Sequence, residues 1–168
     1  MQMRKTKLKN NYCRGMGLME IIIGTTIISL SLVGLITSFN LFVRTGLANT
    51  QKVQAVYILE ESIEAFRYIR DDGWTTNISS LSHGVSYNLA FDGSNWEATT
   101  TSALIDNVFD RTITIVDVYR RDSDDDIIAS TSPDSKTLDP NTVQVTASVS
   151  WDEDEVNATT YFTNIFND

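Results

Sequence analysis

Cysteine is nearly absent from the sequence, because Cys13 is the only one among 168 residues. A single cysteine excludes an intramolecular disulfide and any metal site built from several cysteines. Histidine is equally scarce: His83 stands alone in the polar segment SSLSHGVS, where a loop histidine is the simplest interpretation. Without a Cys/His or Ser/His/Asp grouping and without a glycine-rich phosphate loop, we expect neither enzyme activity nor a cofactor.

Basic residues are scarce beyond the start of the chain. Residues 1–15 contain five Lys and Arg residues and no acid, whereas residues 16–168 contain 8 basic and 22 acidic residues, a formal charge of −14. Nucleic-acid binding by broad phosphate neutralisation requires clustered Lys and Arg. We therefore expect no nucleic-acid partner and a solvated, acidic surface for the body of the protein.

Charged side chains are missing altogether from Ile21 to Val43. At about 1.5 Å per residue, a helix over these 23 residues spans roughly 34 Å, enough to cross a hydrocarbon core of about 30 Å. Basic residues precede this apolar run, and the positive-inside rule then places the N-terminus in the cytoplasm and the chain after Arg44 outside. The sequence predicts a single-pass protein of the inner (cytoplasmic) membrane whose folded part lies outside.

Two ordinary explanations of the apolar run compete. A cleavable secretory signal would find a loose small-x-small site at Gly46-Leu47-Ala48, but the apolar region of such a signal runs for only about 7 to 15 residues. A plain signal anchor explains the basic flank and the run, but it gives no reason for Glu20 at the head of the run. A carboxylate in the membrane interior costs roughly 2.5 to 3.5 kcal/mol, and no Lys or Arg lies within a helical turn or two inward of Glu20.

A cut after Gly15 would supply a partner for Glu20. The new chain would begin at Met16, which puts a free α-ammonium group four residues before the carboxylate. These residues resemble the type IV prepilin and type II secretion pseudopilin family. Its members carry a short basic leader ending in glycine (a class III signal peptide), a hydrophobic first mature residue and glutamate at the fifth mature position. A cut after Gly17 would make Glu20 the third residue and lose this spacing, so Gly15 is the preferred site.

The resemblance implies a set of processing and assembly partners. A membrane prepilin peptidase would cut after Gly15 and N-methylate Met16. Other pilin or pseudopilin subunits would pack against the apolar helix, where Glu20 would pair with the Met16 ammonium group of a neighbour, and the assembly platform and ATPase would act indirectly. The family's frequent helix-bending proline has no counterpart here, because Thr37 occupies about that place.

Helical periodicity continues beyond the apolar run. Apolar residues recur every three or four positions and predict a stripe that covers the inner face of a following domain: Val53, Val56, Leu59, Ile63, Phe66 and Ile69. Glu64 and Arg67 are spaced for an i,i+3 ion pair, and Asp71-Asp72-Gly73 is a helix stop signal. We predict one long helix over residues 16–72. Its weak points are its glycines: Gly24, Gly34 and Gly46.

After Trp74 the periodicity changes to two, which is typical of strands. The pattern predicts strands at 85–91, 96–100, 112–119 and 143–151, and a return of the chain through Tyr161 and Phe162 toward Phe166. The pair Asp92-Gly93 predicts a hairpin turn, and a change of phase in the third strand predicts a bulge. The expected fold class is α+β: a long N-terminal helix packed on an antiparallel sheet of about four strands.

The expected organisation has four segments: the cleaved leader 1–15, the membrane or filament-core half of the helix 16–43, the amphipathic half 44–72 and the globular sheet domain 73–168. This order again resembles pilins. The segment EESIEAFRYIRDDGW and the late VSW before YFTN are similar to small minor pilins or pseudopilins of the PilV-like or general secretion subunit I-like type.

The densest acidic cluster, RDSDDDI, is a weak calcium candidate. Asp122, Asp124 and Asp126 alternate as in a calcium loop, but Ile127 stands where an EF-hand has glycine and Pro133 where it has glutamate. A hairpin tip made soluble by aspartates is the simpler interpretation.

Two functions compete at this point. A structural subunit of a type IV pilus or a type II secretion-like pseudopilus accounts for Gly15, Met16 and Glu20 together. The alternative is a non-assembling, single-pass anchored surface protein with an adhesin-like binding domain. It accounts for the apolar run and the sheet domain but not for Glu20. The N-terminus of the mature protein distinguishes the two.

Overall fold

The computed structural model describes residues 17–166, so Gly15 and Met16 lie outside the described part of the chain. The chain divides into two compact units, residues 1–47 and residues 48–168. We call the second the head unit. It contains the last part of the long helix and every strand found in the described residues.

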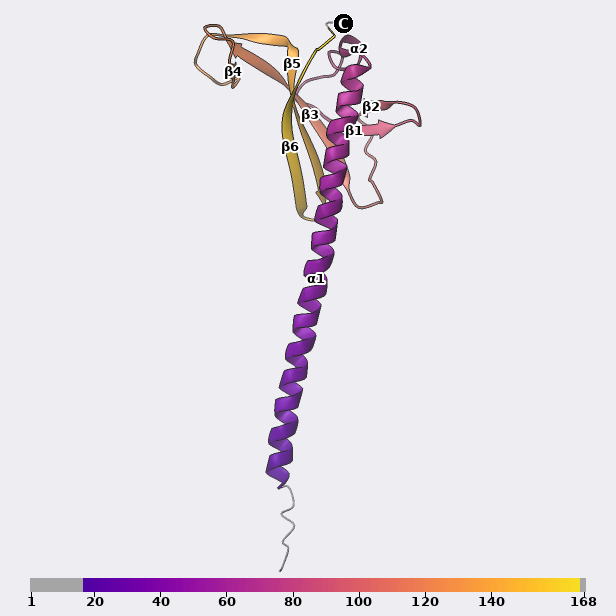
Figure 1. Cartoon of the computed structure of the whole chain (residues 1–168), viewed down its shortest axis with the longest axis vertical. Helices are drawn as coiled ribbons and strands as arrows, with labels where there is room; N and C mark the ends of the chain where they lie inside the picture. The colour runs from indigo at the N-terminus through magenta and orange to yellow at the C-terminus, as the bar shows by residue number, and fades with distance from the viewer. Residues whose placement is uncertain (1–16, 167–168) are drawn as a thin grey trace, which may run out of the picture. The chain divides into compact units, whose positions relative to one another are not determined.

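Helix α1 runs unbroken from Leu18 to Asp71, 54 residues, and confirms the predicted long helix over the described part of the chain (Figure 1). It passes without interruption through the glycines at 24, 34 and 46. It ends at the predicted Asp-Asp-Gly signal, where Gly73 has φ +147°, a backbone conformation that is open to glycine and strained for other residues. A short helix α2, Trp74–Asn77, follows at once.

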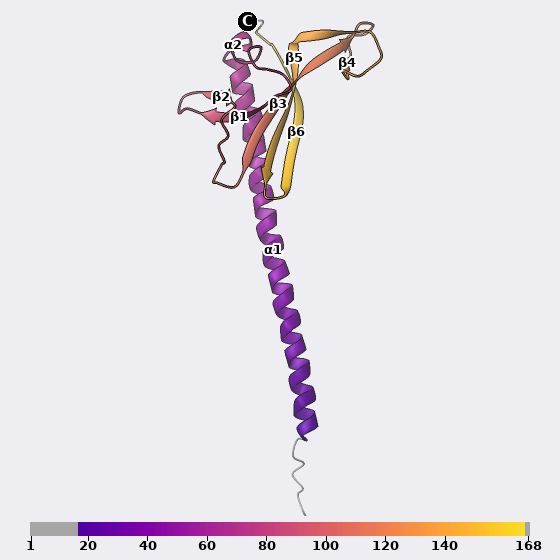
Figure 2. The ribbon, with the colours of Figure 1, turned by 180° about the vertical axis from the view of Figure 1, so that it is seen from behind.

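The head unit is built on one antiparallel sheet in the order β2-β1-β3-β5-β6, with β4 paired to β3 (Figures 1 and 2). The strands are β1 (Ser86–Phe91), β2 (Trp96–Thr99), β3 (Asp110–Arg121), β4 (Ile127–Ile128), β5 (Lys136–Trp151) and β6 (Asp154–Thr163). The α+β class is confirmed, with six strands in place of about four. β4 is only two residues long, which is too short to produce a sequence pattern. β5 starts at Lys136, ahead of the predicted 143, because the polar KTLDPNT stretch shows no alternation.

The predicted irregularity in β3 is confirmed, although the extra residues lie on its partner strand. Asp117 pairs with Val143, and the next residue, Val118, pairs with Asp139. Residues 140–142 of β5 therefore have no partner on β3, although Thr142 still pairs with Thr163 on β6. The alternation of buried side chains in β3 shifts at the same place. Ile115 is followed by Val118 as the next buried residue, three positions later instead of two, as expected for a bulge.

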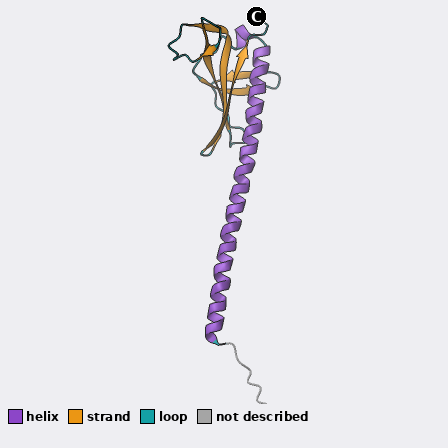
Figure 3. Ribbon diagram, turned by 60° about the vertical axis from the view of Figure 1, so that its left-hand side comes forward, coloured by secondary structure: helices purple, strands orange, loops and turns teal. Residues whose placement is uncertain are grey.

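One stripe of α1 packs on the inner face of the sheet (Figure 3). Its buried residues are Ala55, Leu59, Ser62, Ala65, Phe66 and Ile69. The predicted stripe was right for Leu59, Phe66 and Ile69 and wrong for Val53 and Val56, which are 55% and 39% exposed. Small residues take inward positions instead: Ala55 and Ser62 are both fully buried. The Ser62 hydroxyl donates to the Ile58 carbonyl at 2.7 Å and is thereby satisfied in the core.

Candidate assembly surface on the long helix

The first turn of α1 carries Glu20 with its side chain exposed. Its backbone N–H donates to the Gly17 carbonyl at 2.9 Å, which closes the turn. The positive end of the helix dipole favours a carboxylate at this position. Within residues 17–166 no ion pair involves Glu20, and its expected partner on Met16 belongs to the part of the chain that is not described.

The apolar run beyond Glu20 is exposed on every side of the helix. In residues 18–50 each residue except Gly24 is exposed, including the large Ile, Leu, Val and Phe side chains. Hydroxyl groups within the run donate to carbonyls three or four residues earlier: those of Thr25, Thr26, Ser31, Thr37 and Ser38. Such bonds satisfy polar groups where no water is available. By length and composition α1 can cross a membrane, a property it shares with signal sequences near an N-terminus.

Phe66 attaches the other end of α1 to the sheet. It is fully buried, and its ring meets that of Phe162 on β6 edge to face, with centroids 4.9 Å apart and planes at 60°. One turn later, the Arg70 guanidinium lies 5.5 Å from the Phe162 ring centroid. Aromatic packing thus contributes to holding the helix on the sheet.

Arg111 is a buried cation between α1 and the sheet, and the sequence reasoning missed it. Its guanidinium donates to the Glu61 carboxylate at 2.7 Å and to the Leu89 carbonyl at 2.8 Å, and lies 5.0 Å over the Trp96 ring. Its Nε has no hydrogen-bond partner among the described residues. The available signal was its position two residues before Ile113, which places it on the inward face of β3.

An arginine sits among the aspartates that formed the calcium candidate. Arg121 contacts the carboxylates of Asp124 at 2.7 Å and Asp134 at 2.9 Å, and Asp126 lies 3.8 Å from it. The Asp122 carboxylate accepts a bond from the Thr137 hydroxyl instead. Among the described residues, no group of three or more His, Cys, Asp and Glu side chains is arranged to hold a metal ion.

Hydrogen-bond donors lower the pKa of two carboxylates of this arm, Asp124 and Asp139. The hydrogen bond from Arg121, aided by the Asp126 backbone N–H, lowers the pKa of Asp124. Partial burial raises the pKa of Asp139, but hydrogen bonds from Arg120 and Thr142 and the Asn141 N–H outweigh it, so the pKa falls below its usual value. The arm formed by β4 and the adjoining ends of β3 and β5 is therefore fastened by arginine–aspartate pairs.

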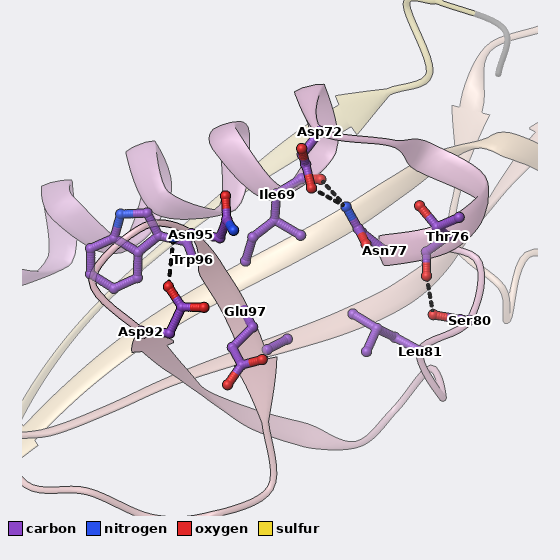
Figure 4. A pocket seen from close by; sticks show the side chains of 11 residues that line it. Ile69, Asp72, Thr76, Asn77, Ser80, Leu81, Asp92, Asn95, Trp96 and Glu97 are labelled. Carbon is purple, nitrogen blue, oxygen red and sulfur yellow. Dashed lines mark hydrogen bonds between the residues drawn. The ribbon is translucent and has the colours of Figure 1, made fainter.

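A polar groove of about 330 Å³ lies between the end of α1, helix α2 and the β1–β2 hairpin (Figure 4). Ile69, Leu81 and Trp96 are apolar residues of its lining, and Asp72, Asp92 and Glu97 supply carboxylates. The predicted Asp92-Gly93 turn is confirmed here: Asp92 accepts the N–H groups of Asn95 and Ser94, and these bonds lower its pKa.

A second groove lies on the face of α1 turned away from the sheet. It is lined by Val53, Val56 and Tyr57, with Lys52 and Glu60 at its two ends. We call these five residues the Val53 groove. Tyr57 is 66% exposed. The apolar character of α1 therefore extends into the head unit on a face that the sheet does not cover.

His83 lies in the loop before β1 and contacts the Asp117 carboxylate through Nδ1. The two residues are 34 positions apart, so the sequence alone could not pair them. The contact ties this loop to β3.

Comparisons of the chain with known proteins gave no match: no protein-family model, no curated protein and no solved structure is significantly similar to it. The chain thus has an α+β fold in which helix α1 is long and apolar enough to span a membrane. The C-terminal part of α1 packs on an antiparallel sheet.

Proposed function

We propose that this protein is a structural subunit of a type IV pilus or a type II secretion-like pseudopilus, of the minor-pilin kind. The observation that carries the proposal is that one unbroken helix carries Glu20 in its first turn, exposes an apolar run, and then buries a stripe against a sheet. In this function, prepilin peptidase cuts after Gly15 and Met16 becomes the N-methylated first residue. The inner membrane holds the subunit before assembly, with the head unit outside.

Glu20 has a defined task in this function. A free carboxylate beside an apolar run is costly in lipid, whereas pairing with the Met16 ammonium group of a neighbouring subunit neutralises both charges. A buried charge pair forms only where both partners lie at the same height along the helix axes. The pair therefore selects one axial register between neighbouring helices. The apolar faces of the helices then pack against one another in the filament core.

The N-terminus of the mature protein tests this proposal directly. We expect intact mass and N-terminal sequencing of membrane-extracted protein to give a chain that begins at methylated Met16. A chain that begins at Met1, or after Ala48, would refute the proposal.

The register role of Glu20 is tested separately by substitution. We expect Glu20→Ala to insert into the membrane normally but to enter sheared filaments at a several-fold lower level, while Met19→Ala, its neighbour without a charge, does not. Normal filament incorporation of Glu20→Ala would remove the register argument and leave the cleavage argument standing.

The polar groove between α2 and the β1–β2 hairpin favours a second candidate function, an anchored surface protein that binds a ligand without assembling. In that function the first residue is Met1 and no filament forms. The same mass measurement therefore decides between the two candidates.

A further inference from the structure

The Val53 groove joins an exposed apolar surface to two opposite charges, Lys52 and Glu60, that form no ion pair with any described residue. Val53, Val56 and Tyr57 are 55%, 39% and 66% exposed, on the side of α1 that does not face the sheet. Within residues 17–166 no ion pair involves Lys52 or Glu60. A patch of this kind on a helix suits contact with another surface that is apolar and that presents an acid to Lys52 or a base to Glu60.

Neither charge can find a partner along its own helix. Lys52 has no acid three or four residues away, and Glu60 has no Lys or Arg three or four residues away. Lys52 and Glu60 are themselves separated by eight residues, about 12 Å along the axis, so they do not meet. At about 100° per residue they also lie about 80° apart around the helix.

From this arrangement we propose that the Val53 groove binds a second copy of this chain, with Lys52 of one copy beside Glu60 of the next. The inference rests on the proposed function, because copies anchored in one membrane have parallel helices. Parallel helices in equal register would place Lys52 opposite Lys52 and Glu60 opposite Glu60, which is repulsive. A stagger of eight residues, about 12 Å or slightly more than two turns, brings Lys52 of one copy beside Glu60 of the next.

The groove between the two charges is filled in the staggered arrangement. The methylene stem of the incoming Lys52 lies along Val56 and Tyr57, and its ammonium group reaches Glu60. Because the two charges lie about 80° apart around the helix, each copy offers Lys52 to one neighbour and Glu60 to another. The contact is heterologous and continues from copy to copy rather than closing a twofold dimer.

The stagger agrees in direction with the pairing proposed for Glu20. In both pairs a lower-numbered cation of the next copy stands beside a higher-numbered acid, so both displace the neighbour outward from the membrane. The two displacements, about 6 Å and about 12 Å, differ by about one helical turn, a gap that long side chains bridge. Lys52 and Glu60 thus act as a second register contact outside the membrane.

Thiol cross-linking tests the contact in the full-length protein. In a Cys13→Ser background, Lys52→Cys and Glu60→Cys are expressed together as separate chains in the same membranes and treated with a short bifunctional thiol reagent. We expect cross-linked dimers from the mixture and a ladder of multimers from the double variant. Each single variant alone gives none, and dimers from a single variant would show equal register and overturn the proposal.

Charge reversal gives a second readout. We expect Lys52→Glu and Glu60→Lys each to lower filament incorporation about five-fold and the double reversal to restore it, while Glu97→Lys, an exposed acid on β2, has no effect. Absence of cross-links in filaments whose chains begin at Met16 would overturn this contact and leave the proposed function intact. Chains that still begin at Met1 would overturn both.

Discussion

Truncation of Phe66 measures how firmly α1 is joined to the sheet. Phe66 is fully buried and stacks edge to face on Phe162. Removal of a buried phenylalanine ring costs about 3–5 kcal/mol, including about 0.5–1.5 kcal/mol from the aromatic pair. Domains of this size are stable by about 5–15 kcal/mol, so Phe66→Ala removes at least about a fifth of the stability of the head unit.

The assay is thermal unfolding of the full chain in detergent micelles, followed by near-ultraviolet circular dichroism of the aromatic residues. At about 3–5 °C per kcal/mol for a unit of this length, we expect Phe66→Ala to lower Tm by about 9–25 °C. Val56→Ala is the matched control, because Val56 lies on the same helix but is 39% exposed and faces away from the sheet. Its Tm should stay within about 2 °C. Equal losses in the two variants would refute the helix–sheet packing described here.

The remaining predictions concern the carboxylates of the head unit. Because the pKa values of Asp92, Asp124 and Asp139 are lowered on folding, the stability they contribute is complete above their ordinary value of 3.8 and is lost as the pH falls through the folded values. We expect Tm to be steady between pH 5 and 7 and to fall below about pH 4, and a Tm that rises on acidification would contradict these interactions. Calcium at millimolar concentration should leave Tm unchanged, since the Arg121 guanidinium already occupies the position between Asp124 and Asp134; a rise of several degrees that Asp124→Asn abolishes would show a calcium site.

The long helix and the strand alternation were predictable because each follows from local periodicity. The helix end at Gly73, the Asp92 turn and the Glu64–Arg67 pair are all set by residues within four positions of one another. The inward face of α1 in its outer part was less predictable. Spacings of three and four allow several stripes, and the sheet selected the one with Ala55 and Ser62 over the one with Val53 and Val56.

Contacts between distant parts of the chain were beyond sequence reasoning. Arg111 meets Glu61, 50 positions earlier, and Arg121 meets Asp134 across the arm that includes the two-residue strand β4. No periodic pattern of residues in the sequence indicates either pair. The candidate site divides in the same way: Glu20 stands out in the sequence as a charge beside an apolar run, whereas the Val53 groove becomes visible only when the packing of α1 shows which side is left uncovered.

The charge of the head unit bears on what drives association. Residues 48–166 contain 7 basic and 20 acidic residues, a formal charge of −13, and five of the basic side chains are already in ion pairs: Arg67, Arg70, Arg111, Arg120 and Arg121. Neighbouring head units therefore repel, although salt screens exposed charges beyond about 8 Å at physiological ionic strength. An exposed ion pair such as Lys52 with Glu60 contributes about 1 kcal/mol or less, which is too little to overcome repulsion across a whole surface. In the proposed function, the packing of the apolar run of α1 must supply the affinity. The charged contacts at Glu20 and at the Val53 groove then select the register in which that packing occurs.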